Sequence, residues 1–200
     1  MRPPPLAGLR VLDLTRLLPG PFATLHLADL GADVIKVEDK GAGDYARNAG
    51  AIHGGTNYFQ LINRNKRSLC LDLKQAEGIE AFMRLAADAD VIIEGFRPGV
   101  VDKLGIGYAA VSALNPRIVY CAITGYGQDG PYRERAGHDL NYLGYCGLLD
   151  QIGVAGSAPA VPNFQIGDLL GGTLSALVGV LAAIVDARAS GHGRYVDVAM

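Results

Sequence analysis

Short runs of β-branched and other apolar residues alternate with segments of helical periodicity along the first two thirds of the chain. The apolar runs predict strands at residues 9–14, 34–37, 68–73, 91–93 and 118–123, and the segments between them predict helices at residues 22–30, 77–87 and 108–114. This alternation is typical of an α/β fold with a mostly parallel, Rossmann-like sheet flanked by helices. Ligands of such sheets bind beyond the carboxyl ends of the strands.

The last third of the chain has a different pattern. A glycine-rich turn region covers residues 124–131, and helical patterns follow at residues 138–149 and 165–189. Residues 194–200 are expected to form a further strand, which stops on an apolar residue with no polar tail or closing helix. We therefore expect the chain to be a fragment of a longer protein.

One segment is apolar enough to raise the question of a membrane. Residues 169–185 carry no charge, but the run is short for a spanning helix, is rich in Gly and Ala, and is flanked by Asp168 and Asp186. A buried core helix is the favoured interpretation, with no membrane partner.

Composition excludes several classes of protein. The 200 residues are 50% hydrophobic and carry 18 Lys and Arg against 20 Asp and Glu, a net charge of −2. These values exclude a disordered tail, a disulfide scaffold and a basic nucleic-acid binder. Cys70, Cys121 and Cys146 lie in apolar stretches without CxxC spacing, which predicts buried, reduced thiols. With no secretory signal at the start, a cytoplasmic protein is expected.

The common nucleotide and metal motifs are missing from the sequence. No G-x-G-x-x-G follows the first predicted strand, no P-loop occurs, and the four histidines show no metal-ligand spacing. We therefore expect the protein to bind no nicotinamide nucleotide, no ATP and no metal. A hydrolase of the G-x-S-x-G type is excluded on the same basis.

Basic residues gather at strand edges. Residues 63–67 (NRNKR) precede the third predicted strand, Lys74 closes it, and Arg97 follows the fourth. Such a set can hold the phosphates of a nucleotide-like ligand, or it can be a solvated loop. The spacing alone leaves both interpretations open.

Two side chains are candidates for proton transfer. His138 and Asp168 each lie near the start of a predicted helix, where the helix dipole favours a neutral imidazole and an ionised carboxylate. Both would then accept protons readily. A lone Asp at a helix start is nevertheless more often a cap, and a lone His is usually structural.

Several motifs in a fixed order carry a family resemblance. They are residues 19–22 (PGPF), 30–38 (LGADVIKVE), 65–74 (NKRSLCLDLK), 96–99 (FRPG) and 123–127 (ITGYG). In this order they resemble the family III CoA-transferase superfamily. Residues 137–142 (GHDLNY) are similar to its alpha-methylacyl-CoA racemase branch.

The resemblance implies roles for individual residues. His138 and Asp168 match the two acid/base residues of the racemases. An arginine usual in the family is replaced here by Asp39, so either Lys40 contacts a CoA phosphate instead or CoA binds differently. CoA would be part of the substrate, and no separate cofactor or metal is implied. Other positions that match CoA or thioester contacts are Leu71, Asp72, Leu73, Lys74, Arg97, Gly137, Asp139, Leu140, Asn141 and Tyr142.

The implied reaction is epimerisation of a 2-methylacyl-CoA thioester. One base removes the α-proton and the other returns a proton to the opposite face, so we expect His138 and Asp168 about 6–7 Å apart. Main-chain N–H groups near Asp139 would stabilise the enolate. A rival reaction is CoA transfer with Asp168 as nucleophile, in a branch that generally lacks a histidine at the position of His138. A non-catalytic CoA-binding protein is a third possibility.

The resemblance also implies that a 200-residue chain is short for this family. Proteins of this family are markedly longer, and their two subunits interlock. Residues 1–200 are thus expected to be the N-terminal part of the large domain of the family fold, without the smaller domain and the C-terminal return. We expect an intertwined homodimer of the full-length protein, and an isolated piece with exposed apolar surface and little activity.

Overall fold

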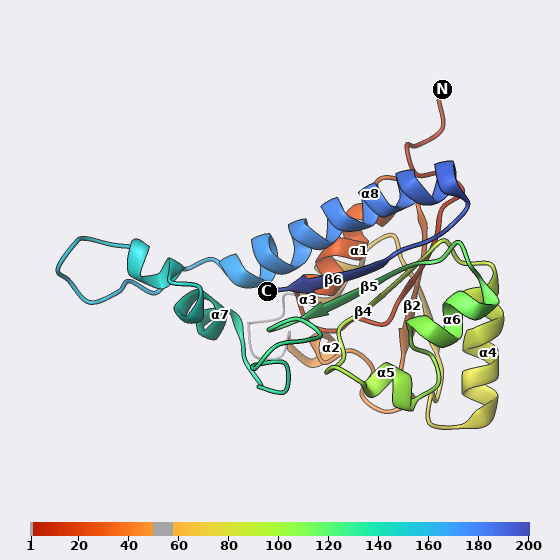
Figure 1. Cartoon of the computed structure of the whole chain (residues 1–200), viewed down its shortest axis with the longest axis horizontal. Helices are drawn as coiled ribbons and strands as arrows, with labels where there is room; N and C mark the ends of the chain where they lie inside the picture. Colours follow the sequence, from red (N-terminus) through yellow and green to blue (C-terminus); the bar gives the residue numbers. More distant parts are fainter. Residues whose placement is uncertain (1, 50–57) are drawn as a thin grey trace.

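A parallel sheet forms the centre of the computed structural model, which describes residues 2–49 and 58–200 (Figure 1). All neighbouring strands pair in parallel, in the order β3-β2-β1-β4-β5-β6. The strands are β1 (Arg10–Asp13), β2 (Asp33–Glu38), β3 (Arg67–Cys70), β4 (Val91–Glu94), β5 (Val119–Thr124) and β6 (Tyr195–Ala199). The six predicted strands are all present, and the predicted α/β fold is confirmed.

Helices cover both faces of the sheet because alternate side chains of each strand point in opposite directions. Val11 and Ile93 pack into a cluster under α1 and α8, whereas Leu12 and Ile92 pack into a second cluster under α4, α5 and α6 (Figure 1). The helices of the two layers are α1 (Pro19–Asp29), α8 (Ser175–Ser190), α4 (Ala76–Ala87), α5 (Val100–Lys103) and α6 (Tyr108–Leu114).

Shorter helices lie in the segment between β2 and β3 and in the segment after β5. They are α2 (Ala46–Ala49), α3 (Tyr58–Asn63), α7 (Asp139–Tyr145) and the 3₁₀ turn η1 (Leu148–Gln151). One helix had been expected over residues 138–149. Gly147 divides it, because its φ of 80° is left-handed and cannot continue an α-helix.

The long apolar helix changes geometry along its length. Its first part, η2 (Gly167–Leu174), is a wide π-helical segment that continues directly into α8. One side of α8 is buried through Ala176, Val180 and Ile184, whereas Val178 and Val185 are each 70% exposed. The expectation of a buried core helix is therefore right for one side only. Gly167–Ser190 is, within the described part of the chain, the single helix long and apolar enough to cross a membrane by length and composition.

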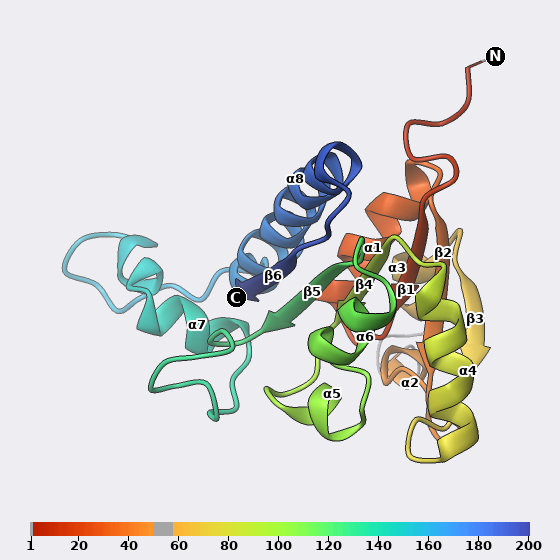
Figure 2. The same ribbon diagram turned by 45° about the vertical axis from the view of Figure 1, so that its right-hand side comes forward.

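The cysteines depart from the prediction. Cys121 is buried in β5, but Cys70 and Cys146 are exposed. Cys70 ends the edge strand β3, and Cys146 follows α7, which projects beyond the end of β5 (Figure 2). Apolar neighbours in the sequence do not bury a thiol where no second layer covers the element.

A buried ionic network supports the carboxyl end of β1. The ammonium of Lys66 lies 3.0 Å from Asp13, and that of Lys36 lies 2.9 Å from Asp44, with all four side chains at most 2% exposed. Burial acts to raise the pKa of Asp13, yet Lys36 and Lys66 hold it well below its usual range. Each charge has an opposite partner, which buried charges require.

The cations of residues 63–67, for which phosphate binding and a solvated loop were both left open, have carboxylate partners within the chain. Lys66 belongs to the buried network, Arg64 pairs with Asp29, and the Arg67 guanidinium donates to Asp33 over 2.6 and 2.9 Å. None of these three cations lines either of the two cavities described below.

Candidate active site

A cleft of about 290 Å³ opens at the carboxyl ends of the central strands. Its walls come from the loops after β1, β4 and β5 and from the residues that lead into α7. β1 lies between β2 and β4, where the order of the strands reverses, and this is the point at which such sheets bind ligands.

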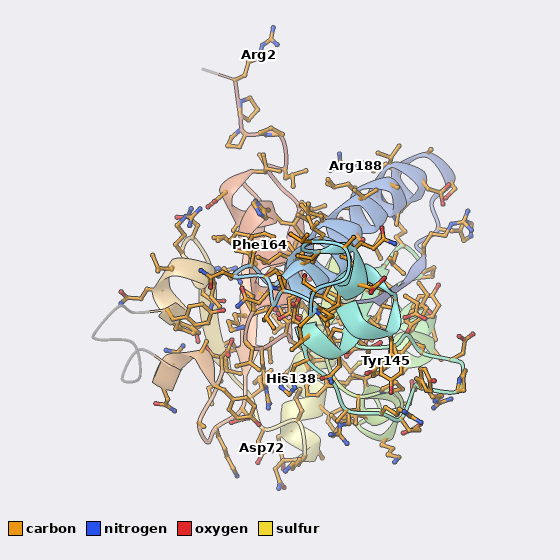
Figure 3. The ribbon with its side chains drawn as sticks, turned by 90° about the vertical axis from the view of Figure 1, so that its left-hand side faces the viewer. Arg2, Asp72, His138, Tyr145, Phe164 and Arg188 are labelled. Atoms are coloured by element: carbon orange, nitrogen blue, oxygen red, sulfur yellow. The ribbon has the colours of Figure 1, made fainter. Side chains whose placement is uncertain are left out.

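His138 and Asp168 both line this cleft. His138 precedes α7, and its main-chain N–H donates to the Asn141 side chain at 2.9 Å. Asp168 is the second residue of η2, and its main-chain N–H donates to Oδ1 of Asp139 at 2.9 Å. Two segments 29 residues apart are thereby joined at the cleft. Figure 3 looks onto this side of the molecule, with His138 and Tyr145 labelled around α7.

The carboxyl group of Asp168 has an unusual environment. Burial raises its pKa to about 6, the negative charge of Asp139 acts in the same direction, and His138 opposes both. The charge of Asp168 also acts on Tyr58, at the start of α3: burial and Asp168 together raise the pKa of the Tyr58 phenol. A carboxyl with this pKa is present in both protonation states near neutral pH and can donate or accept a proton.

Tyr142 fixes the walls of the cleft. Its ring packs so closely against three glycines that a Cβ at Gly125, Gly137 or Gly167 would lie 2.6, 2.7 or 3.4 Å from a ring atom. Its hydroxyl donates to the Gly137 carbonyl at 2.5 Å. Burial, with Asp168, raises the pKa of Tyr142 to about 12, so this phenol stays protonated. Its contacts make it a support for the loop that carries His138.

A second cavity of about 690 Å³ adjoins the first. Arg16 and Phe96 line both cavities and form their common wall. The exposed Lys40 pairs with Asp72 at 2.7 Å on the rim of the second cavity. Two adjoining cavities with a shared wall suit a long ligand with chemically different ends.

The structure divides the sequence-predicted residues into three groups. His138, Asp168, Arg97, Gly137 and Tyr142 line the first cavity, and Lys40, Leu71, Asp72, Leu73 and Lys74 line the second. Asp139, Leu140 and Asn141 line neither. Asp139 and Asn141 instead accept main-chain hydrogen bonds, and Leu140 is 43% exposed.

Arg16 was missed by the sequence reasoning. Its guanidinium donates to Asp39 at 2.8 Å and lies 5.6 Å from the ring centroid of Phe96 and 5.3 Å from that of Tyr45. Asp39, at the position where the resemblance implied an arginine, thus pairs with an arginine from another loop. The position of Arg16 just beyond β1 is the signal that could have identified it.

The loop between β5 and α7 supplies further residues that the sequence reasoning missed. Tyr126, Arg133 and Arg135 line the first cavity. Their glycine-rich surroundings, directly after a central strand, were the available signal.

Comparison with known proteins places this geometry in a family. The family model described as CoA-transferase family III matches residues 6–200. Human "Succinyl-CoA:glutarate CoA-transferase" is 42% identical over 96% of this chain and 44% of its own length. Mouse "Alpha-methylacyl-CoA racemase" is 38% identical over 98% of this chain and 48% of its own length.

A solved structure agrees. The crystal structure of a CaiB/BaiF family protein from Brucella suis superposes with a TM-score of 0.91 at 40% identity, over 99% of this chain and 53% of that one. The chain therefore spans about half the length of the relatives that it matches. With a family model that covers almost all of its residues, the chain belongs to CoA-transferase family III.

Proposed function

We propose that this protein exchanges the α-proton of 2-methylacyl-CoA thioesters and so epimerises the carbon next to the thioester. The observation that carries the proposal is the presence of His138 and Asp168 in one cleft. Two-base exchange needs one group that accepts and one that donates a proton. Imidazole is the commonest proton-transfer group, and Asp168, with a pKa of about 6, retains a protonated population near neutral pH.

The steps balance as follows. A ring nitrogen of neutral His138 accepts the α-proton, and the C–H electron pair moves into the thioester to give an enolate. Protonated Asp168 then donates its proton to the opposite face of the α-carbon. His138 ends protonated and Asp168 ionised, which is the state needed to react with the other epimer. Their separation of about 6–7 Å stays a prediction.

The CoA portion would occupy the second cavity. Lys40 and Lys74 line this cavity and are suited to the phosphates of CoA. Leu71 and Leu73 offer apolar surface to the rest of the CoA molecule. The pantetheine arm would pass Arg16 and Phe96 to bring the thioester to Asp168.

CoA transfer is the second candidate, and a specific observation favours it. The relative named as a succinyl-CoA:glutarate CoA-transferase is 42% identical, whereas the named racemase is 38% identical. In this reaction the Asp168 carboxylate attacks the thioester carbonyl, the C–S bond breaks, and CoA leaves as the thiolate. The thiolate then attacks the aspartyl carbonyl of the resulting anhydride, which releases the donor acid and leaves Asp168 as a CoA thioester. The acceptor carboxylate attacks this thioester to form a second anhydride, and the released thiolate attacks the acceptor carbonyl, which gives the new acyl-CoA and restores the Asp168 carboxylate.

Deuterium exchange separates the two reactions. The full-length protein is incubated in D₂O with one epimer of 2-methylbutyryl-CoA, and α-deuterium and chirality are followed by NMR and chiral chromatography. We expect deuterium uptake with loss of chirality, abolished in His138→Ala and Asp168→Asn. His192→Ala is the matched control, because His192 is exposed and bonds only near Ser190. CoA transfer to added succinate without α-exchange would overturn the proposal in favour of the second candidate.

A further inference from the structure

The wall between the two cavities depends on one short loop. Residues 95–98 (GFRP) follow β4 and line the first cavity, and Phe96 lines both cavities together with Arg16. The guanidinium of Arg16 lies 5.6 Å from the centroid of the Phe96 ring. The shape of this loop therefore decides how the two cavities connect.

A buried carboxyl group holds the loop. Glu94, the last residue of β4, is 2% exposed and itself lines neither cavity. Its Oε2 accepts the main-chain N–H of Phe96 at 2.7 Å. The Phe96 ring in turn packs against the buried cluster that contains Leu12 and Ile92. Glu94 thus fixes the main chain of the residue whose ring forms the common wall.

The surroundings of this carboxyl favour its neutral form. Burial raises the pKa of Glu94, and the hydrogen bond from Phe96 opposes this without reversing it. The charges that act on Glu94 from neighbouring elements are those of Asp102 in α5 and Asp197 in β6, and both are negative. Both therefore add to the rise that burial causes.

The other titratable groups that Glu94 acts on offer it no positive charge. They are Tyr120 and Cys121 of β5 and Tyr195 of β6. Burial raises the pKa of each of these groups, and the charge of Glu94 acts in the same direction. All three are neutral near neutral pH and cannot pair with an ionised Glu94.

Ionisation would place a buried charge beside two carboxylates. A buried charge without an opposite partner is costly, so the carboxylate gains by turning toward water. This movement breaks the hydrogen bond to the Phe96 N–H. It thereby releases the loop that forms the common wall.

From these contacts we infer that Glu94 is a positioning residue: its neutral carboxyl holds Phe96 in place, and with it the wall that a ligand spanning both cavities must pass. The inference rests on the proposed function only for the identity of that ligand, a CoA thioester. It goes beyond that function because it makes binding depend on a proton that neither reacting group carries.

The first measurement needs no ligand. The full-length protein is prepared with ¹⁵N-labelled phenylalanine, the Phe96 amide signal is assigned by its absence in Phe96→Leu, and its NMR position is followed as pH rises. We expect the signal to move with a midpoint of about 8 in the wild type. Glu80→Gln, the control, should behave alike, since the Glu80 side chain is 70% exposed on α4. Glu94→Gln keeps an acceptor oxygen but cannot ionise, so its signal should not move in that range.

The second measurement is the dissociation constant of acetyl-CoA, determined by calorimetry at pH values of about 7 and about 9. With a pKa of about 8, about one tenth of the Glu94 side chains are protonated at the higher pH. We therefore expect wild-type binding to weaken about ten-fold relative to Glu94→Gln, a comparison that cancels the titration of the ligand. Glu94→Leu lacks the acceptor and should bind about five-fold or more weakly than Glu94→Gln at the lower pH.

Three results would overturn the inference. They are a Phe96 amide signal that does not titrate in the wild type, a wild-type affinity that is equal at both pH values, and an equal loss of affinity in Glu94→Gln. Both comparisons use Glu94→Gln, so they stand even where Glu94→Leu fails to fold. A protein that binds acetyl-CoA at neither pH would overturn the proposed function instead, while the amide signal would still decide whether Glu94 holds Phe96.

Discussion

Oδ1 of Asp139 accepts the main-chain N–H of Asp168 at 2.9 Å, so the residue after one proposed base holds the backbone of the other. The same carboxylate helps to raise the pKa of Asp168. The position and the pKa of Asp168 thus both depend on Asp139. Substitutions of Asp139 can remove its charge and its hydrogen bond separately.

Asp139→Asn keeps an acceptor oxygen and removes the charge. We expect the pKa of Asp168 to fall from about 6 toward its ordinary value, as measured by NMR titration of ¹³C-labelled carboxyl groups. Asp139→Ala should also loosen the start of η2 and destabilise the protein by about 1 kcal/mol. Asp129→Asn, an exposed site, is the control. An unchanged Asp168 midpoint in Asp139→Asn would contradict the assignment.

The raised pKa of Glu94 makes the stability of the fold depend on pH. Burial raises its pKa to about 8; the 2.7 Å hydrogen bond from the Phe96 N–H opposes this, and Asp102 and Asp197 act in the same direction as burial. Between its ordinary pKa of 4.5 and about 8 the folded protein holds this proton more tightly than the unfolded chain. The contribution of Glu94 to stability is therefore lost as pH rises through that window.

Glu94→Gln should not show this loss. We expect the free energy of unfolding of the variant, relative to wild type, to improve by about 1 kcal/mol or more as pH rises from about 5 to 8. Urea unfolding at several pH values measures it. Glu80→Gln, whose side chain is 70% exposed, should give a flat difference. A flat difference for Glu94→Gln as well would show that the carboxyl is not neutral when buried.

The buried network predicts a large stability effect. Lys66→Met removes the nearer of the two ammonium groups beside Asp13, leaves Lys36 at 3.9 Å, and removes two further hydrogen bonds made by the Lys66 ammonium. We expect a loss of about 3–5 kcal/mol in urea unfolding. The exposed Lys103→Met should cost less than about 0.5 kcal/mol. Equal effects would mean that the network is not a stabilising unit.

The packing of Tyr142 gives a test with a matched control in the same region. Gly137→Ala places a Cβ 2.7 Å from the Tyr142 ring, whereas Gly144→Ala, in α7, meets nothing within 4 Å. We expect about 1–3 kcal/mol of destabilisation from the first and a neutral or stabilising effect from the second. Tyrosine signals in near-UV circular dichroism should change only in Gly137→Ala. The opposite ranking would show that Tyr142 has room to move.

The sequence allowed the sheet to be predicted because each buried strand leaves a local apolar run. It also allowed the location of the cleft to be predicted, because the carboxyl ends of parallel strands meet at one edge. The pairing of Arg16 with Asp39 could not be predicted, since it joins loops 23 residues apart. The burial of Lys66 could not be predicted for the same reason. The run NRNKR is typical of a surface loop, and the carboxylate that pairs with Lys66 belongs to Asp13, which is distant in the sequence.

The geometry of the helix that carries Asp168 could not be predicted either. Local composition does not distinguish an α from a π turn, and the wide turn shows only in main-chain contacts such as that of the Ser175 N–H with the Leu170 carbonyl, five residues back. Gly171 and Gly172 permit the close packing that surrounds it, because a Cβ at either would collide with Met200 or Pro19.

That wide turn also sets the angle between Asp168 and the buried side of α8. Each residue of an α-helix adds about 100° of rotation, so deleting one residue within η2 would leave α8 seated on the sheet and turn the carboxyl out of the cleft. Restoring the residue would turn it back. The length of η2 therefore decides where the Asp168 carboxyl points, with no change to the aspartate itself.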